Sequence, residues 1–378
     1  MARYLEQFRA SPVDFVRRVP AGLQWRIAER LVPVQRSAAR RELAARAVRS
    51  QRALRRAVKR AGSRQLVLRL ANAHASQIPE LHWFREEVEG LSNGTLRIAF
   101  VNTWTTPDNT REETTTMQGV ISGRADLGWA GTRAFGVLGV RSLDPLQAPL
   151  LFDEYGSLAA VVGDELMYEM MEPLERLDLV GLVVLPGGLR KPFAFTRRLL
   201  SPRDYEGTRL RIHESLVAEA TYRRLGAEAV ALSVYEMASQ AMNLCDGLDI
   251  QTEALRGWNL RGSITYNVNL WPRTLAVAAS QRSFAWLAEP ERELLREASR
   301  RTLARALEHL RDQAERDWSA IPPSVNPIMA APEDVAGVRD KVEPVHEDLR
   351  RHPETSAFYR RLVTLVERNR SDGASERS

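Results

Sequence analysis

One stretch of the sequence, residues 200–212, reads LSPRDYEGTRLRI. Its first part is rich in turn-forming residues, and its end alternates in polarity, which predicts a short strand. Side chains on a strand alternate between its two faces. Leu210 and Ile212 would then face a core, while Arg209 and Arg211 would share the other face, toward solvent or a cleft. Most arginines are simply hydrated, so the segments around this strand decide whether either arginine has a role.

Strand patterns alternate with helical patterns on both sides of this stretch. The predicted strands lie at residues 65–73, 96–101, 125–130, 180–185, 193–196, 248–251 and 274–279. The predicted helices lie at residues 80–91, 111–122, 156–176, 215–225, 235–243, 290–320, 332–351 and 354–369. This alternation is typical of α/β domains with parallel or mixed sheets covered by helices.

The order of these elements predicts two lobes. A Pro-Gly-Gly run at residues 186–188 suggests a crossing between them, and the strand at 274–279 is expected to return to the first lobe. The expected parts are an N-terminal extension at 1–63, lobe 1 at 64–187 plus 274–316, lobe 2 at 188–273 plus 317–370, and a disordered tail at 371–378.

The composition of the 378 residues is that of an ordinary globular protein, with 44% hydrophobic and 27% charged residues. No segment approaches the ~18 consecutive apolar residues of a membrane-spanning helix. Cys245 is the only cysteine, which excludes an intramolecular disulfide and a cysteine-based metal cluster. The six histidines show no paired metal-ligand spacing, so we expect no metal.

The positive charge of the chain is concentrated in its first 63 residues, which hold 16 basic and four acidic residues, a net charge of +12. Because the whole chain carries +6, the remainder carries −6. Residues 36–60 are predicted to form a basic amphipathic helix. Three interpretations remain open: packing on the chain's own body, contact with an anionic membrane surface, and contact with nucleic acid, for which no motif is present. No secretory signal segment is recognised before residue 64.

Motifs of common enzymes are missing from the sequence. There is no G-x-S-x-G turn, no phosphate-binding Walker loop and no G-x-G-x-x-G after a strand. The sequence therefore gives no reason to expect an enzyme or a cofactor.

Four segments, taken in order, resemble one family. They are LVLRLANA at 66–73, QGVISGRADLG at 118–128, APLLFDE at 148–154, and GLR at 188–190 followed by the stretch quoted above. Together they are similar to the substrate-binding subunits of tripartite ATP-independent periplasmic (TRAP) transporters, often called C4-dicarboxylate-binding proteins. The resemblance runs from about residue 65 to residue 369. It implies a two-lobed periplasmic-binding-protein-like fold of type II character, with an interlobe cleft and a long C-terminal helix.

The resemblance also implies a ligand site. The family's arginine that pairs with the ligand carboxylate matches Arg211, and a second, assisting arginine matches Arg190. A guanidinium suits this role because its planar fork meets a carboxylate through two parallel hydrogen bonds. Asn72, at the end of the first strand, matches a position that can contact ligand, although capping of the strand is an equally good interpretation. Trp271 is a candidate for the cleft wall, with a core position as the alternative.

One turn departs from the family pattern. The asparagine that commonly helps to hold the carboxylate is replaced by Ile250, which cannot donate a hydrogen bond. Gln251 or Glu253 could take its place through a small shift in the turn, or the pocket could have changed its ligand.

The resemblance implies a solute-binding protein that captures a small organic acid and delivers it to TRAP membrane subunits. It also implies a periplasmic or otherwise extracytoplasmic location. The alternative is a cytoplasmic ligand-sensing or enzyme-like relative of the same fold, which the lack of a recognised signal segment favours.

Overall fold

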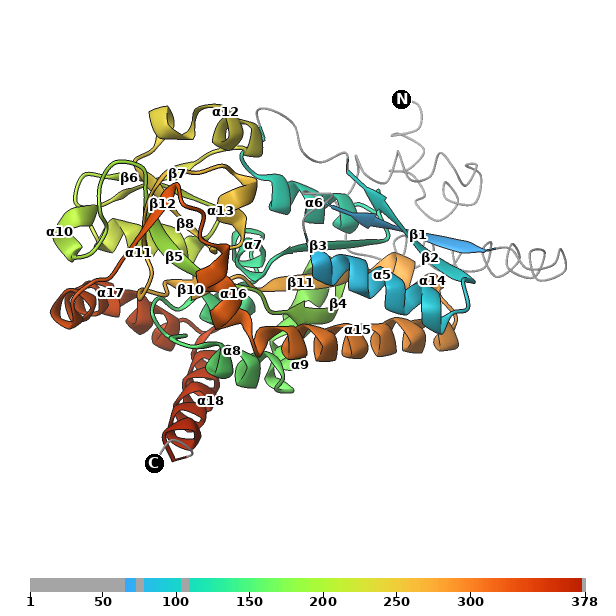
Figure 1. Ribbon diagram of the computed structural model, residues 1–378. Helices are drawn as coiled ribbons and strands as arrows, with labels where there is room; N and C mark the ends of the chain where they lie inside the picture. Colours follow the sequence, from blue (N-terminus) through green and yellow to red (C-terminus); the bar gives the residue numbers. More distant parts are fainter. Residues whose placement is uncertain (1–64, 73–77, 103–108, 376–378) are drawn as a thin grey trace, which may run out of the picture. The chain divides into compact units, whose positions relative to one another are not determined.

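The computed structural model describes residues 65–72, 78–102 and 109–375 (Figure 1). The predicted basic helix at 36–60, and with it any contact with a membrane surface, lies outside these residues. The chain divides after Gln65 into two units, and the fold described here is that of the second. Within the described residues, no helix combines the length and the apolar character needed to cross a bilayer.

The first sheet has the strand order β2-β1-β3-β11-β4. Its strands are β1 (Leu66–Ala71), β2 (Leu96–Val101), β3 (Leu127–Gly131), β4 (Leu179–Leu185) and β11 (Leu275–Ser280). The first three pair in parallel, whereas β11 runs antiparallel to both of its neighbours, so the sheet is mixed. The late strand β11 lies in this sheet, between β3 and β4, and its six residues are all buried.

The second sheet has the order β12-β9-β5-β8-β6-β7, and β10 pairs with β5 away from this path. Its strands are β5 (Leu189–Ala194), β6 (Arg209–Ile212), β7 (Glu228–Ala231), β8 (Gly247–Ile250), β9 (Gly262–Thr265), β10 (Trp271–Pro272) and β12 (Val325–Ile328). The alternation on β6 is as predicted on its apolar side, where Leu210 and Ile212 join a buried cluster. The two arginines of this strand differ in burial: Arg209 is exposed, whereas Arg211 is buried, with 5% of its surface exposed.

Helices cover these sheets. They are α5 (Pro79–Leu91), α6 (Glu112–Ile121), α7 (Thr132–Val137), α8 (Tyr155–Val162), α9 (Leu166–Met171), α10 (Pro202–Tyr205), α11 (Leu216–Arg224), α12 (Val234–Leu244), α13 (Ala254–Gly257), α14 (Gln281–Trp286), α15 (Glu289–Leu310), α16 (Gln313–Ala320), α17 (Pro332–Arg351) and α18 (Ser356–Ser375), with the 3-10 helices η1 (Arg141–Gln147) and η2 (Glu172–Leu177). Helices α5 and α15 lie side by side against the first sheet (Figure 1).

Two of the predicted long helices are broken. The helix predicted at 156–176 consists of α8, α9 and η2, because Gly163 ends α8 and Pro173 begins the tighter η2. The helix predicted at 290–320 ends at Leu310 and restarts at Gln313 as α16. Gln313 is 2% exposed, and its side chain donates to Asp317 at 3.1 Å. The break therefore places a polar side chain in the interior.

The last two helices pack on different layers. Helix α17 contacts α10 and α11, beside the second sheet, whereas α18 contacts α8 and α9, beside the first. Tyr359, Leu362 and Val366 belong to the core cluster of those helices. Residues 317–370 therefore pack partly beside the second sheet, through α17, and partly beside the first, through α18. Helix α18 also continues to Ser375, so the predicted tail at 371–378 begins as helix.

His346 on α17 gives a pH-dependent contribution to stability. Its Nε2 bonds the carbonyl of Pro149 at 2.8 Å, and its Nδ1 bonds the hydroxyl of Tyr359 at 2.7 Å. Burial lowers the pKa of His346 below its ordinary value of 6.5. The unfolded chain therefore takes up a proton more readily, and stability falls as the pH drops below 6.5.

We expect wild type to lose stability between pH 7 and pH 5 more steeply than His346→Gln, by at most about 1.4 kcal/mol per pH unit. Urea unfolding at several pH values measures this. Parallel pH profiles of the two proteins would contradict it.

Candidate functional site

A cavity of about 1170 Å³ lies between the two sheets. Its wall includes residues of β3, β5, β6, β8 and β11 and of the helices α5, α12, α13 and α15, together with the crossing at residues 186–188. Four arginines line it: Arg133, Arg190, Arg211 and Arg273. Large apolar and aromatic side chains also line it, among them Trp83, Trp129, Tyr235 and Trp258. Such a mixture of apolar surface with a few charged groups is typical of small-molecule sites.

Arg211 is the most deeply placed of these cations. It lies on β6 opposite Leu248 of β8, and its guanidinium is buried at the cavity wall. It makes no ion pair with a carboxylate of the described residues, and its Nε has no hydrogen-bond partner among them. Burial, together with the positive charge of Arg190, lowers the pKa of Arg211 to about 10. At neutral pH the group is therefore a buried cation without an anion.

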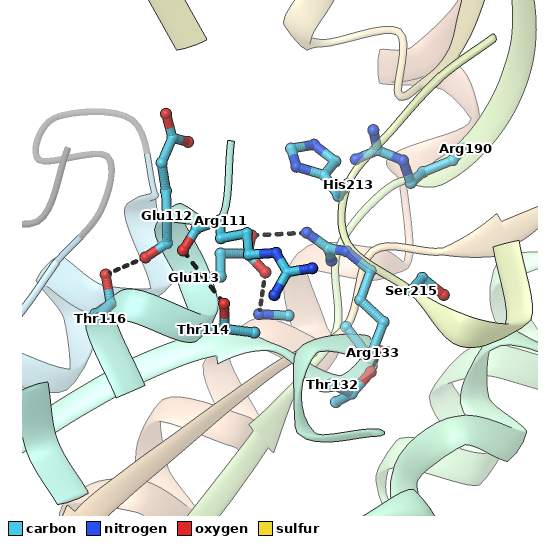
Figure 2. Close-up of polar contacts among 12 residues, drawn as sticks. Arg111, Glu112, Glu113, Thr114, Thr116, Thr132, Arg133, Arg190, His213 and Ser215 are labelled. Carbon is cyan, nitrogen blue, oxygen red and sulfur yellow. Dashed lines mark hydrogen bonds and ion pairs between the residues drawn. The ribbon is translucent and has the colours of Figure 1, made fainter. Parts of the chain in front are cut away.

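His213 provides the hydrogen bond that Arg211 does make. Arg211 Nη1 lies 2.8 Å from His213 Nε2. A guanidinium has only donors, so Nε2 must accept and the imidazole is neutral in this arrangement. Figure 2 shows His213 beside Arg190, and both border the same small void as Arg133.

Arg190 on β5 is paired within the protein. Its Nε donates to Asp249 Oδ2, and its Nη2 donates to the Asp249 carbonyl at 2.7 Å. The antiparallel register of β5 and β8 brings Asp249 close to Arg190, because it places Pro192 opposite Asp249 and Lys191 opposite Ile250. The side chain of Asp249 also accepts from Trp271 Nε1 at 3.2 Å. The charge of Arg190 is therefore balanced by a carboxylate of the protein itself.

Arg133 and Arg273 were not predicted as site residues. Arg133, on α7, donates to Glu113 of α6 at 2.7 Å (Figure 2). Arg273 donates to Glu80 of α5 at 2.6 Å. A Cβ on Gly187 would lie within 2.5 Å of the Arg273 guanidinium, which explains a glycine at this crossing. The only available signal was the position of Arg133 just after a predicted strand, where α/β folds bind ligands.

The altered turn contributes to the wall. Ile250, Gln251 and Glu253 all line the cavity. Gln251 Oε1 accepts from Arg190 Nη1 at 3.3 Å, and Glu253 Oε1 accepts from Gln313 Nε2. Gln251 and Glu253 therefore present polar groups beside the apolar Ile250.

Asn72 and Trp271 lie behind the wall instead. Asn72 is 1% exposed, and its Oδ1 accepts from Trp129 Nε1 at 2.8 Å, so it holds a tryptophan that does line the cavity. Trp271 is 1% exposed and borders a small void of about 10 Å³ beside Arg190 and His213. Asn72 therefore supports Trp129 of the wall, and Trp271 donates to Asp249, the partner of Arg190.

The part of the chain that the structure describes contains no group of three or more histidine, cysteine, aspartate or glutamate side chains placed to hold a metal ion. Among its described residues, the wall combines three arginine–carboxylate pairs with one guanidinium, that of Arg211, that has no carboxylate partner.

Fold and cavity together define a class of protein: a two-lobed α/β binding protein with a ligand cavity between its sheets. The sequence model described as DctP, bacterial extracellular solute-binding protein, family 7, matches residues 70–352, and the chain belongs to this family. The predicted resemblance to TRAP substrate-binding subunits is confirmed.

Individual relatives agree with this assignment. The chain is 31% identical over 103 residues to the C4-dicarboxylate-binding periplasmic protein DctP of Rhodobacter capsulatus, a match that spans 31% of that protein and 27% of this chain. The sugar acid binding protein of Advenella mimigardefordensis in complex with galactonate aligns with a TM-score of 0.68 at 18% identity, covering 81% of this chain and 99% of that one. A TRAP periplasmic solute binding protein of Shewanella oneidensis with bound succinate gives 0.68 at 18% identity, covering 80% and 100%. The two-lobed fold is therefore that of TRAP periplasmic binding proteins.

Proposed function

We propose that this chain is the solute-binding subunit of a TRAP-type transporter and that it captures an organic acid through an ion pair with Arg211. The observation that carries the proposal is Arg211, a residue that is 5% exposed, lines the cavity and has no carboxylate partner among the described residues. A buried unpaired charge is costly. A ligand carboxylate would remove that cost and add two charge-assisted hydrogen bonds.

Binding would stabilise a closed arrangement of the lobes. A ligand can shift an open and a closed state only through its different affinity for the two, and a cavity lined from both sheets gives such a difference. Asp317 on α16 supports this mechanism, because it joins segments of both layers. It accepts hydrogen bonds from Tyr155 of α8, from Thr252 at 2.8 Å and from Gln313 at 3.1 Å.

The proposal includes a location and partners. The closed, loaded protein would be presented on the extracytoplasmic side to membrane permease subunits of the same transporter. The family to which the chain belongs is described as extracellular and solute-binding, which supports this location over a cytoplasmic sensor. The role needs no catalysis, so we infer a binding protein and not an enzyme.

A thermal-shift screen of mono- and dicarboxylates tests the proposal. At ~100 times its dissociation constant, a ligand stabilises the folded state by about 2.7 kcal/mol, which corresponds to a rise of several degrees in Tm. The primary amide of each acid is the matched control, because it keeps the shape and removes the charge. If no acid raises the Tm, or if amides raise it as much as acids do, the proposed function is wrong.

A further inference from the structure

The charged groups of the cavity wall determine how many carboxylates it can accept. Three of its four arginines are already balanced. Arg133 pairs with Glu113 at 2.7 Å and Arg273 pairs with Glu80 at 2.6 Å, with all four side chains at most 13% exposed. Arg190 pairs with Asp249, with side chains 9% and 4% exposed. An anion arriving near any of these pairs would have to compete with a carboxylate that is already in place.

Arg211 is the exception among the described residues of the wall. Its one hydrogen bond to a described residue goes to the neutral His213. The wall therefore offers one uncompensated guanidinium, which is enough for one carboxylate.

Glu253 is the complementary exception. It lines the cavity, forms no ion pair with a described residue, and is exposed. One of its oxygens accepts from Gln313, and the other lies near the crossing, 3.5 Å from where a Cβ on Gly188 would be. A carboxylate in this position accepts hydrogen bonds from a donor and repels another carboxylate.

We propose that the ligand carries a single carboxylate, held by Arg211, and a hydrogen-bond donor at its remote end, a hydroxyl or an amine, that faces Glu253. Dicarboxylates are then excluded. This inference rests on the proposed function, because it concerns the same cavity. Three observations together support it: one arginine without a carboxylate partner, three ion pairs within the wall, and Glu253, which forms no ion pair with a described residue.

Two matched sets of ligands test the inference on the full chain. Galactonate and galactarate differ only in whether the sixth carbon is a hydroxymethyl or a carboxylate. Hexanoate, 6-hydroxyhexanoate, 6-aminohexanoate and adipate share a six-carbon chain and differ only at the remote end, so the second set separates hydroxyl from amine. Isothermal titration calorimetry gives the affinity of each.

We expect each dicarboxylate to bind about tenfold or more weakly than the hydroxylated acid of its set. In Glu253→Gln, which keeps the shape and removes the repelling charge, that ratio should fall to about threefold or less. Glu228→Gln is the control, because Glu228 is an exposed acid on β7 outside the cavity, and it should keep the wild-type ratio.

The outcomes separate the inference from the proposed function. Binding of neither set would overturn the proposed function and the inference with it. Binding in which a dicarboxylate equals or exceeds its hydroxylated partner would overturn the inference alone. An unchanged ratio of the two affinities in Glu253→Gln would also overturn it, because Glu253 would then have no effect on the group at the remote end of the ligand.

Discussion

Arg211→Ala is expected to weaken the binding of any acid that stabilises the wild-type protein by at least about a hundredfold. Hydrogen bonds to charged groups contribute about 1.5 to 3 kcal/mol each, and a carboxylate on the guanidinium fork forms two. The loss of about 3 kcal/mol or more corresponds to that factor. Calorimetric titration of the acid that gives the largest thermal shift measures it.

The same substitution should leave the unliganded fold intact. Arg211 is a buried cation with no carboxylate partner among the described residues, so its removal does not leave a buried carboxylate unpaired. The Tm without ligand should therefore not fall by more than a few degrees. A nearly unchanged Tm would show that weaker binding results from the lost contact and not from unfolding.

Arg209→Ala is the matched control for Arg211→Ala. Arg209 lies on the same strand two residues earlier, but its side chain is 45% exposed and faces Asp246 at 3.8 Å. It should bind ligand like wild type. Equal losses in the two variants, or normal binding by Arg211→Ala, would contradict the proposed role of Arg211.

Local patterns predicted much of the fold. The alternation at residues 209–212 predicts the strand β6 and its apolar face, because this signal depends only on neighbouring residues. The long helices were less accurate. Gly163 and Pro173 mark the breaks in the helix predicted at 156–176. The break before Gln313, in the helix predicted at 290–320, instead depends on the burial of the Gln313 side chain.

The site was predicted only in part, because its energetics depend on long-range pairs. Arg211, Arg190, Gln251 and Glu253, four of the predicted site residues, line one cavity. The partner of Arg190 could not be predicted, since Asp249 lies 59 residues away and meets it only through the register of β5 and β8. Whether a carboxylate balances an arginine depends on such long-range partners. The sequence alone could therefore not distinguish a balanced cation from an unpaired one.

The four arginines that line the cavity differ in this respect, because three of them pair with carboxylates of the wall and Arg211 does not. Closed ion pairs are fixed parts of the wall: they hold α5, α6 and β8 in place and keep the local charge near neutral. An unpaired guanidinium remains available to a ligand. The difference between paired and unpaired arginines depends on each carboxylate of the wall. Removing one of these carboxylates should therefore have a large effect on the stability of the protein.

Asp249→Ala is expected to destabilise the folded protein by about 3 to 5 kcal/mol. The Asp249 side chain is 4% exposed and balances the buried Arg190. Without it, Arg190 becomes an uncompensated cation close to Arg211, and breaking a buried pair on one side costs this amount. The indole of Trp271 also loses its acceptor. Urea unfolding monitored by tryptophan fluorescence measures the change.

Two comparisons decide whether the buried charge is the cause. Asp246→Ala removes a nearby carboxylate that forms a surface ion pair with Arg209 and accepts from its backbone N–H at 2.8 Å, so it should cost about 1 to 2 kcal/mol, less than Asp249→Ala. Removing both charges in Arg190→Met with Asp249→Leu should recover most of the lost stability, because apolar residues of similar size often replace a buried pair at little cost. A double variant as unstable as Asp249→Ala would show that packing around Asp249, and not the uncompensated arginine, determines the stability of this wall.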